Sequence, residues 1–126
     1  MEWSVLVKRL MEEYGEKWNR ASRITDWLDT AIDDMEKAID AYMDEDKQYG
    51  DAMLSKAESD LNHFKEWMEK VDPELAEYFY TVFMTTIKEI ELARDNDNVL
   101  WQISEYKIPA LLQMTAQLFA VLLLYY

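Results

Sequence analysis

Apolar residues recur every three or four positions along almost the whole chain, and this spacing limits the possible fold more than any other feature. Over the first 42 residues the row runs through Val7, Met11, Tyr14, Trp18, Ala21, Leu28, Ile32, Met35, Ile39 and Tyr42. Such spacing places side chains on one face of an α-helix, whereas a half-buried strand alternates every second residue. Glycine and proline occur only twice each, too rarely for the many turns of a strand-rich fold. The sequence therefore predicts an all-α protein.

Interruptions of the spacing predict where the helices begin and end. Residues 3–43 form either one helix of about 40 residues or two that meet at residues 19–22. We expect two, because Ser22 can cap a new helix and Gly15 weakens the first. A polar connection then follows at residues 44–50, where Gly50 is suited to ending a helix.

The second half of the chain carries clearer signals. Asp72 and Pro73 together predict a helix start, since aspartate caps free backbone N–H groups and proline is tolerated in the first turn. Residues 95–98 predict a turn that caps the next helix, and Pro109 is expected to kink or restart that helix. With 126 residues, half of them apolar, we expect a single domain, residues 1–126, folded as a bundle of five to six helices.

Charge is distributed unevenly along the chain, whose formal net charge is −13. Residues 1–23 hold five basic and four acidic side chains, a balance of +1, whereas residues 24–107 hold 22 acids and eight bases, a balance of −14. Such a chain is repelled by nucleic acid and anionic membranes and attracted to basic protein surfaces. We therefore expect a basic protein partner and no direct binding of nucleic acid. The absence of cysteine and of an N-terminal signal pattern predicts a cytoplasmic location.

One acidic row stands out within this charge. It follows the spacing of a helix face over about 27 Å, at 1.5 Å per residue, and it contains Asp26, Asp29, Asp33, Glu36, Asp40 and Asp44. An ordinary solvated helix face is one interpretation. The other is a surface that occupies the basic groove of a nucleic-acid-binding protein. Aspartate outnumbers glutamate in the row although glutamate is the better helix former, which favours the second interpretation.

Residues with catalytic or metal-binding chemistry do not form a known pattern. His63 is the only histidine, and no Glu-x-x-His pair of a di-iron bundle is present. Calcium-loop spacing around residues 44–55 lacks the required glycine and the final acid. The adjacent carboxylates Asp33 and Asp34 are interpreted as part of a solvated helix face. We expect no enzymatic activity, no metal and no cofactor.

The C-terminal 19 residues contain no charged side chain. A helix without a charged face needs more cover than one monomer provides, so we expect a homodimer or larger oligomer. The residues expected to mediate self-association are Leu118, Phe119, Leu122 and Leu123. A membrane anchor is the less favoured alternative, because Gln113 and Gln117 interrupt the apolar run and no basic cluster flanks it.

Three short motifs resemble those of flagellin export chaperones, which are small acidic helical bundles. These are Ala21-Ser22 before an amphipathic helix, Leu54-Ser55-Lys56-Ala57, and Asp97-Asn98-Val99-Leu100 at the start of a late helix. This resemblance implies a chaperone with an apolar groove for a partner peptide. In type of composition, though in no individual motif, the chain is also similar to anti-CRISPR proteins and nucleic-acid mimics.

Two functions are thus expected for a protein that acts by binding. The first is an inhibitor whose acidic row occupies a basic surface. The second is an export or assembly chaperone, with a tryptophan such as Trp27 or Trp101 as an apolar anchor.

Overall fold

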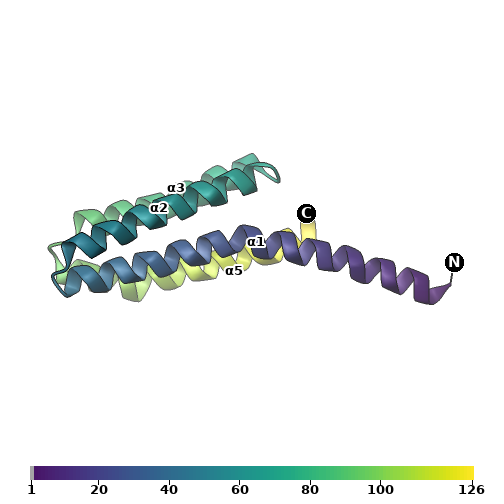
Figure 1. Cartoon of the computed structure of the whole chain (residues 1–126), viewed down its shortest axis with the longest axis horizontal. Helices are drawn as coiled ribbons and strands as arrows, with labels where there is room; N and C mark the ends of the chain where they lie inside the picture. The colour runs from purple at the N-terminus through teal and green to yellow at the C-terminus, as the bar shows by residue number, and fades with distance from the viewer. Residues whose placement is uncertain (1) are drawn as a thin grey trace.

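The computed structural model describes residues 2–126, and these residues form an all-α bundle of four helices. Helix α1 (Trp3–Met43) is followed by α2 (Lys47–Glu69) and α3 (Pro73–Leu92). The fourth helix is continuous from Asp97 to Tyr125 and consists of α4 (Asp97–Gln102), the π-helical turn η1 (Ile103–Lys107) and α5 (Ile108–Tyr125). Successive helices run antiparallel to one another, and the N-terminal part of α1 projects beyond the rest (Figure 1). The all-α prediction is confirmed, whereas the expected count of five to six helices is not.

Helix α1 runs through the point where we expected two helices to meet. Ala21 and Ile24 are both buried there, so the apolar face continues without interruption into the bundle. Gly15 lies inside the helix, and a single interior glycine costs only about 1 kcal/mol relative to alanine. A cost of this size does not break a long helix at Gly15, and the buried face at Ala21 and Ile24 carries the helix through Ser22.

The turn between α1 and α2 is shorter than predicted. Glu45 adopts the left-handed conformation, with φ of 62°, and Asp46 caps α2 by accepting a hydrogen bond from Tyr49 N at 3.1 Å. Gly50, expected to end a helix, instead lies within α2. The ring of Tyr42 occupies the space into which a Cβ atom at residue 50 would project. This glycine therefore allows α1 and α2 to approach closely.

The two later helix starts are confirmed. Asp72 accepts hydrogen bonds from the backbone N–H groups of Glu74 at 3.0 Å and Leu75 at 3.1 Å, with Pro73 in the first turn of α3. Asn96 caps the fourth helix by accepting from Val99 N at 3.2 Å. Pro109, expected to kink or restart that helix, does not restart it, because the helix is continuous from Asp97 to Tyr125. The turn before Pro109 widens to the π-helical η1, a common adjustment where the regular hydrogen-bond ladder is interrupted.

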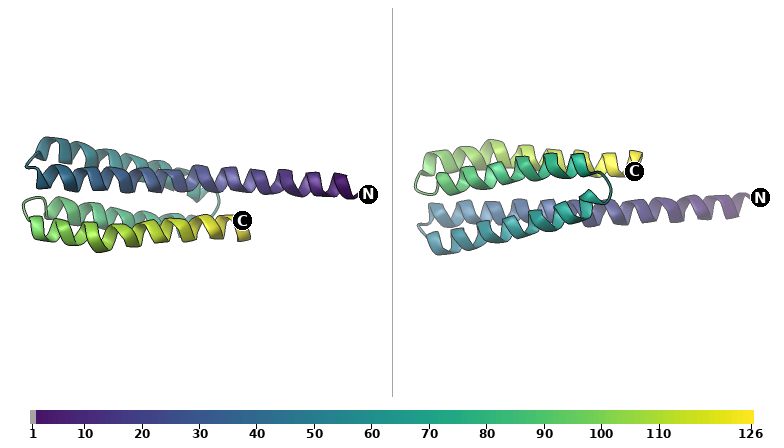
Figure 2. Two further views of the ribbon diagram at one scale, coloured as in Figure 1. Left: turned by 90° about the horizontal axis from the view of Figure 1, so that it is seen from below. Right: turned by 90° about the horizontal axis from the view of Figure 1, so that it is seen from above.

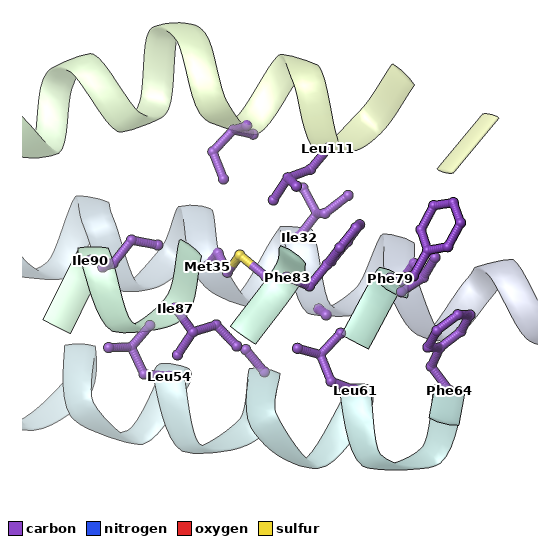
Figure 3. Close-up of a cluster of buried hydrophobic side chains, with 14 of the residues drawn as sticks. Ile32, Met35, Leu54, Leu61, Phe64, Phe79, Phe83, Ile87, Ile90 and Leu111 are labelled. Carbon is purple, nitrogen blue, oxygen red and sulfur yellow. The ribbon is translucent and has the colours of Figure 1, made fainter. Parts of the chain in front are cut away.

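A single core unites the four helices. Ile32 and Met35 from α1 meet Leu61 and Phe64 from α2, together with side chains of α3 and α5 (Figure 3). Phe83 of α3 is completely buried, and Leu111 brings α5 into the same cluster. Because one face each of α1 and α5 is buried in this common core, their opposite faces point into solvent.

The first 18 residues of α1 do not take part in this core. We call residues 3–20 the arm, because none of them is buried and Ala21 is the first residue of α1 that is. The arm leaves the bundle as a straight continuation of α1, whereas the C-terminus ends beside α1 near the base of the arm (Figures 1 and 2). The hydroxyl of Tyr126 donates a hydrogen bond to the Asp72 carboxylate there.

Candidate interaction surface on the first helix

All six residues of the acidic row are exposed. Five of them belong to α1, and Asp44 is the residue that directly follows it. Since α1 is continuous over these positions, the steps of three and four residues keep the side chains on one side of the helix. The geometry assumed for a binding surface, a single straight row directed into solvent, is therefore present.

Within residues 2–126, only one ion pair involves a residue of the row. Lys37 Nζ lies 3.0 Å from Asp33 Oδ2, four residues apart on the exposed side of α1. A solvated pair of this kind contributes about 0–1 kcal/mol and is weakened by salt. The other five acids have no cationic partner within ion-pair distance among the described residues. The row thus keeps most of its negative charge available.

Partial burial, and to a smaller extent the neighbouring acids, raise the pKa values of two residues of the row. Partial burial raises the pKa of Asp29, and the negative charge of Asp26 adds to the rise. Partial burial likewise raises the pKa of Glu36, with smaller contributions from Asp33 and Asp40. In both cases the folded protein disfavours the charged carboxylate. A positively charged partner would offset this cost, because an opposite charge favours the ionised carboxylate.

One end of the row borders an apolar groove. Asp26 and Asp29 line a groove of about 300 Å³ between α1 and α5, whose other walls are Trp18, Ser22, Thr25, Leu112, Thr115, Ala116 and Phe119. Trp18 and Phe119 close one side of it by packing edge to face, with 4.9 Å between ring centroids. A partner on the acidic row can therefore also reach apolar surface at this end.

The residues expected to mediate self-association divide into two pairs. Leu118 and Leu122 are buried in the core of the monomer, with 2% and 0% of their surface exposed. Phe119 and Leu123 are half-buried at its edge. The first pair cannot contact another chain, because α1 already covers that side of α5. The expectation overlooked that a neighbouring helix of the same chain supplies this cover.

The outer face of α5 is mainly apolar and has no charged side chain. The continuous helix Asp97–Tyr125 is long and apolar enough to cross a membrane, with 28% of its most apolar stretch buried. Core helices of water-soluble proteins meet the same criteria of length and composition. The membrane alternative therefore gains only weak support.

A pair of buried carboxyl groups was missed by the sequence analysis. Asp34, interpreted there as solvated, is only 1% exposed, and Asp60 of α2 is 5% exposed. Burial raises the pKa of Asp60 to about 7, assisted by hydrogen bonding to Asp34 and by the charge of Asp34, whereas Lys56 acts in the opposite direction. Lys56 Nζ lies 3.9 Å from Asp34 Oδ1. The residue spacing already contained the signal, since Asp34 lies between Ala31 and Ala38 on a buried face.

This buried pair does not resemble a catalytic site. Neither carboxyl lines the grooves described for this structure, and a reacting acid needs access to its substrate. His63, the single histidine, stacks on Trp27 with 4.6 Å between ring centroids. Among residues 2–126, no group of three or more histidine, aspartate or glutamate side chains could hold a metal ion.

Comparison of the chain with protein-family models, with curated proteins and with solved structures finds no match.

Proposed function

We propose that this protein acts without catalysis, by binding a basic surface of another protein through its acidic row. The observation that carries the proposal is the continuous exposure of six acidic side chains over residues 26–44, with one neighbouring base, Lys37. The raised pKa values of Asp29 and Glu36 support it, because a cationic partner would stabilise carboxylates that the free protein disfavours.

The class of partner follows from charge and length. A row of about 27 Å with negative charge at every turn resembles the edge of a short nucleic-acid duplex electrostatically. A basic groove that normally binds phosphates would attract it, and occupation of that groove would exclude the nucleic acid. The proposed activity is therefore inhibition of a nucleic-acid-binding protein in the cytoplasm.

The test is affinity capture from the native host, followed by elution with increasing salt. Wild-type protein should retain basic proteins at low salt and release them as salt screens the contact. A variant with Asp29, Asp33 and Asp40 changed to lysine should retain none of them.

The matched control changes the same number of charges on other parts of the surface. Glu58, Glu66 and Glu91 form no ion pair in the structure, so their change to lysine alters net charge equally while leaving the row intact. This control should retain most binding. Equal capture by the two triple variants would show that the row is not the binding surface.

A peptide-binding chaperone is the second candidate, and an apolar cleft favours it. The cleft has a volume of about 510 Å³ and lies between α3 and the fourth helix; its lining includes Leu92, Val99, Ile103 and Tyr106. Binding there would tolerate salt and would be weakened by Tyr106→Ala, whose side chain is 70% exposed. Trp27, considered earlier as an anchor, is half-buried against His63 and so is less accessible.

A further inference from the structure

The arm exposes large apolar side chains although it is a helix. Trp3 is 76% exposed, Met11 69% and Tyr14 57%. Trp3, Val7 and Met11 line a shallow groove along the arm together with Ser4, Lys8 and Glu12. Only the second half of the arm has a neighbour among the described residues, where Leu10 and Tyr14 lie near Leu123 and Leu124 of α5.

The apolar row of the arm continues the row that the bundle buries. Val7 and Tyr14 are followed at the same seven-residue interval by Ala21, Leu28 and Met35. The last three are all 0% exposed, because α2 and α5 cover this side of α1. A seven-residue repeat of this kind is typical of helices that pack against a second helix. The arm therefore has the surface of a paired helix without its partner.

The centre of the arm shows which partner fits. Lys8 and Arg9 precede Leu10 and Met11, and Glu12 and Glu13 follow them. When two such segments run antiparallel and are centred between residues 10 and 11, the basic pair of each lies level with the acidic pair of the other. In a parallel arrangement, bases would lie level with bases and acids with acids. The charge pattern is thus complementary to itself when the arms run antiparallel about this centre, and not when they run parallel in register.

The charge of the remaining chain favours the same arrangement. Residues 24–107 have a balance of −14, whereas residues 1–23 have a balance of +1. Antiparallel arms hold the two acidic bodies at opposite ends of the pair, while parallel arms would bring them side by side. Since like charges repel over about 10 Å at moderate salt, the antiparallel arrangement carries less repulsion.

We infer that two copies of this chain associate through their arms, which pack antiparallel about a two-fold axis between Leu10 and Met11. Trp3 of each copy lies level with Trp18 of the other, and Val7 with Tyr14. The middle of each arm, around Val7 to Met11, passes the exposed C-terminal end of the other copy's α5, where Leu124 is 72% exposed. The acidic row begins eight residues beyond Trp18, so it stays free in the pair. This inference does not depend on the proposed function.

Sedimentation equilibrium of the full chain tests the association. Wild-type protein should be a dimer at micromolar concentration. The variant Lys8→Glu/Arg9→Glu should be a monomer, because the centre of its arm is wholly acidic, and Glu12→Lys/Glu13→Lys should be a monomer for the opposite reason. An equimolar mixture of the two variants should again form a dimer.

A charge-matched control separates this effect from net charge. Lys70→Glu/Lys88→Glu makes the same change in net charge on the bundle, so it should remain a dimer. A wild-type protein that stays monomeric throughout the concentration range would overturn the inference, as would dimers of either arm variant alone. Wild-type monomers that float with phosphatidylcholine vesicles would also overturn it, since the arm would then bind lipid.

Disulfide cross-linking tests the direction of the pair in a chain that has no natural cysteine. A mixture of Val7→Cys and Tyr14→Cys proteins should form a cross-linked heterodimer under mild oxidation. Val7→Cys alone should not cross-link, because in the antiparallel pair its two copies are offset by seven residues, about 10 Å at 1.5 Å per residue. Cross-linking of Val7→Cys to itself, without the mixed product, would indicate parallel arms and contradict the inference.

Discussion

Asp34 and Asp60 bring two carboxyl groups together in the contact between α1 and α2, and each retains one buried oxygen with no hydrogen-bond partner. Two buried carboxylates cannot both ionise without electrostatic cost, and Lys56 lies at the edge of ion-pair distance. The contact between α1 and α2 therefore contains a titrating group.

This pair predicts that stability depends on pH. The pKa of Asp60 is raised from its ordinary value of 3.8 to about 7, so the folded state retains a proton that the unfolded state releases. Stability should therefore fall as pH rises from about 4 to about 7, and then level off as far as this group is concerned. Urea unfolding followed by circular dichroism across this range measures the effect.

Asp60→Asn should remove this pH dependence and stabilise the protein at pH 8 by on the order of 1–3 kcal/mol, because the buried charge is lost. Glu91→Gln, a change at an exposed acid, is the control and should keep the wild-type profile. If the free energy of unfolding of Asp60→Asn still fell between pH 4 and 7 as steeply as that of the wild type, a group other than Asp60 would cause the pH dependence.

The two glycines should respond to alanine in opposite directions. Gly50→Ala places a methyl group against the ring of Tyr42 and should destabilise the protein by about 1–3 kcal/mol. Gly15→Ala meets no other atom within 4 Å and lies inside a helix, so it should stabilise α1 by about 0.5–1 kcal/mol. Thermal unfolding of both variants provides the comparison, and equal shifts would mean that α1 and α2 are less closely packed than described.

Phe83 should be highly sensitive to truncation, as a fully buried aromatic residue of the core. Its side chain is 0% exposed, so Phe83→Ala would remove buried apolar contacts and leave a cavity in the core. The expected loss is about 3–5 kcal/mol in denaturant unfolding. Trp101→Ala, at a residue 49% exposed, should change stability far less. A small effect at Phe83 would contradict the position of α3 in the core.

Local capping chemistry and apolar spacing were enough to predict part of this fold. The starts of α3 and α4 were predicted correctly because they depend on local hydrogen bonds. Asp72 and Asn96 accept hydrogen bonds from backbone N–H groups two or three residues away. The exposure of the acidic row also followed from its own spacing. These features require no knowledge of which helix lies beside which.

The features that were missed depend on contacts between distant segments. Gly50 resembles a helix end until Tyr42 of another helix is placed against it. Asp34 resembles a solvated acid until α2 covers it, and Leu118 and Leu122 resemble an interface until α1 packs on them. The continuity of α1 was misjudged for the same reason, since packing within the bundle stabilises a helix that local propensity would interrupt.

Repulsion within the acidic row should make the free protein more stable in salt. Partial burial is the larger cause of the raised pKa values of Asp29 and Glu36, and salt does not relieve it. The smaller contribution comes from the negative charges of neighbouring acids in the row, and salt screens that contribution. Asp29→Asn/Glu36→Gln should therefore increase the free energy of unfolding at low salt by a few tenths of a kcal/mol for each like-charge contact removed. The melting temperature should rise accordingly. The control Glu58→Gln/Glu66→Gln should show no such gain, and an equal gain in both would assign the repulsion to net charge.

Competition with DNA tests the proposed function most directly. A short fluorescent DNA duplex is first bound to a basic protein captured from the host. The acidic protein is then added at low salt while the fluorescence anisotropy of the duplex is recorded. We predict that the wild-type acidic protein releases the duplex, and that this release weakens as salt increases. The variant Asp29→Lys/Asp33→Lys/Asp40→Lys should not release it. Release of the duplex by that variant as readily as by the wild type would contradict the role of the acidic row.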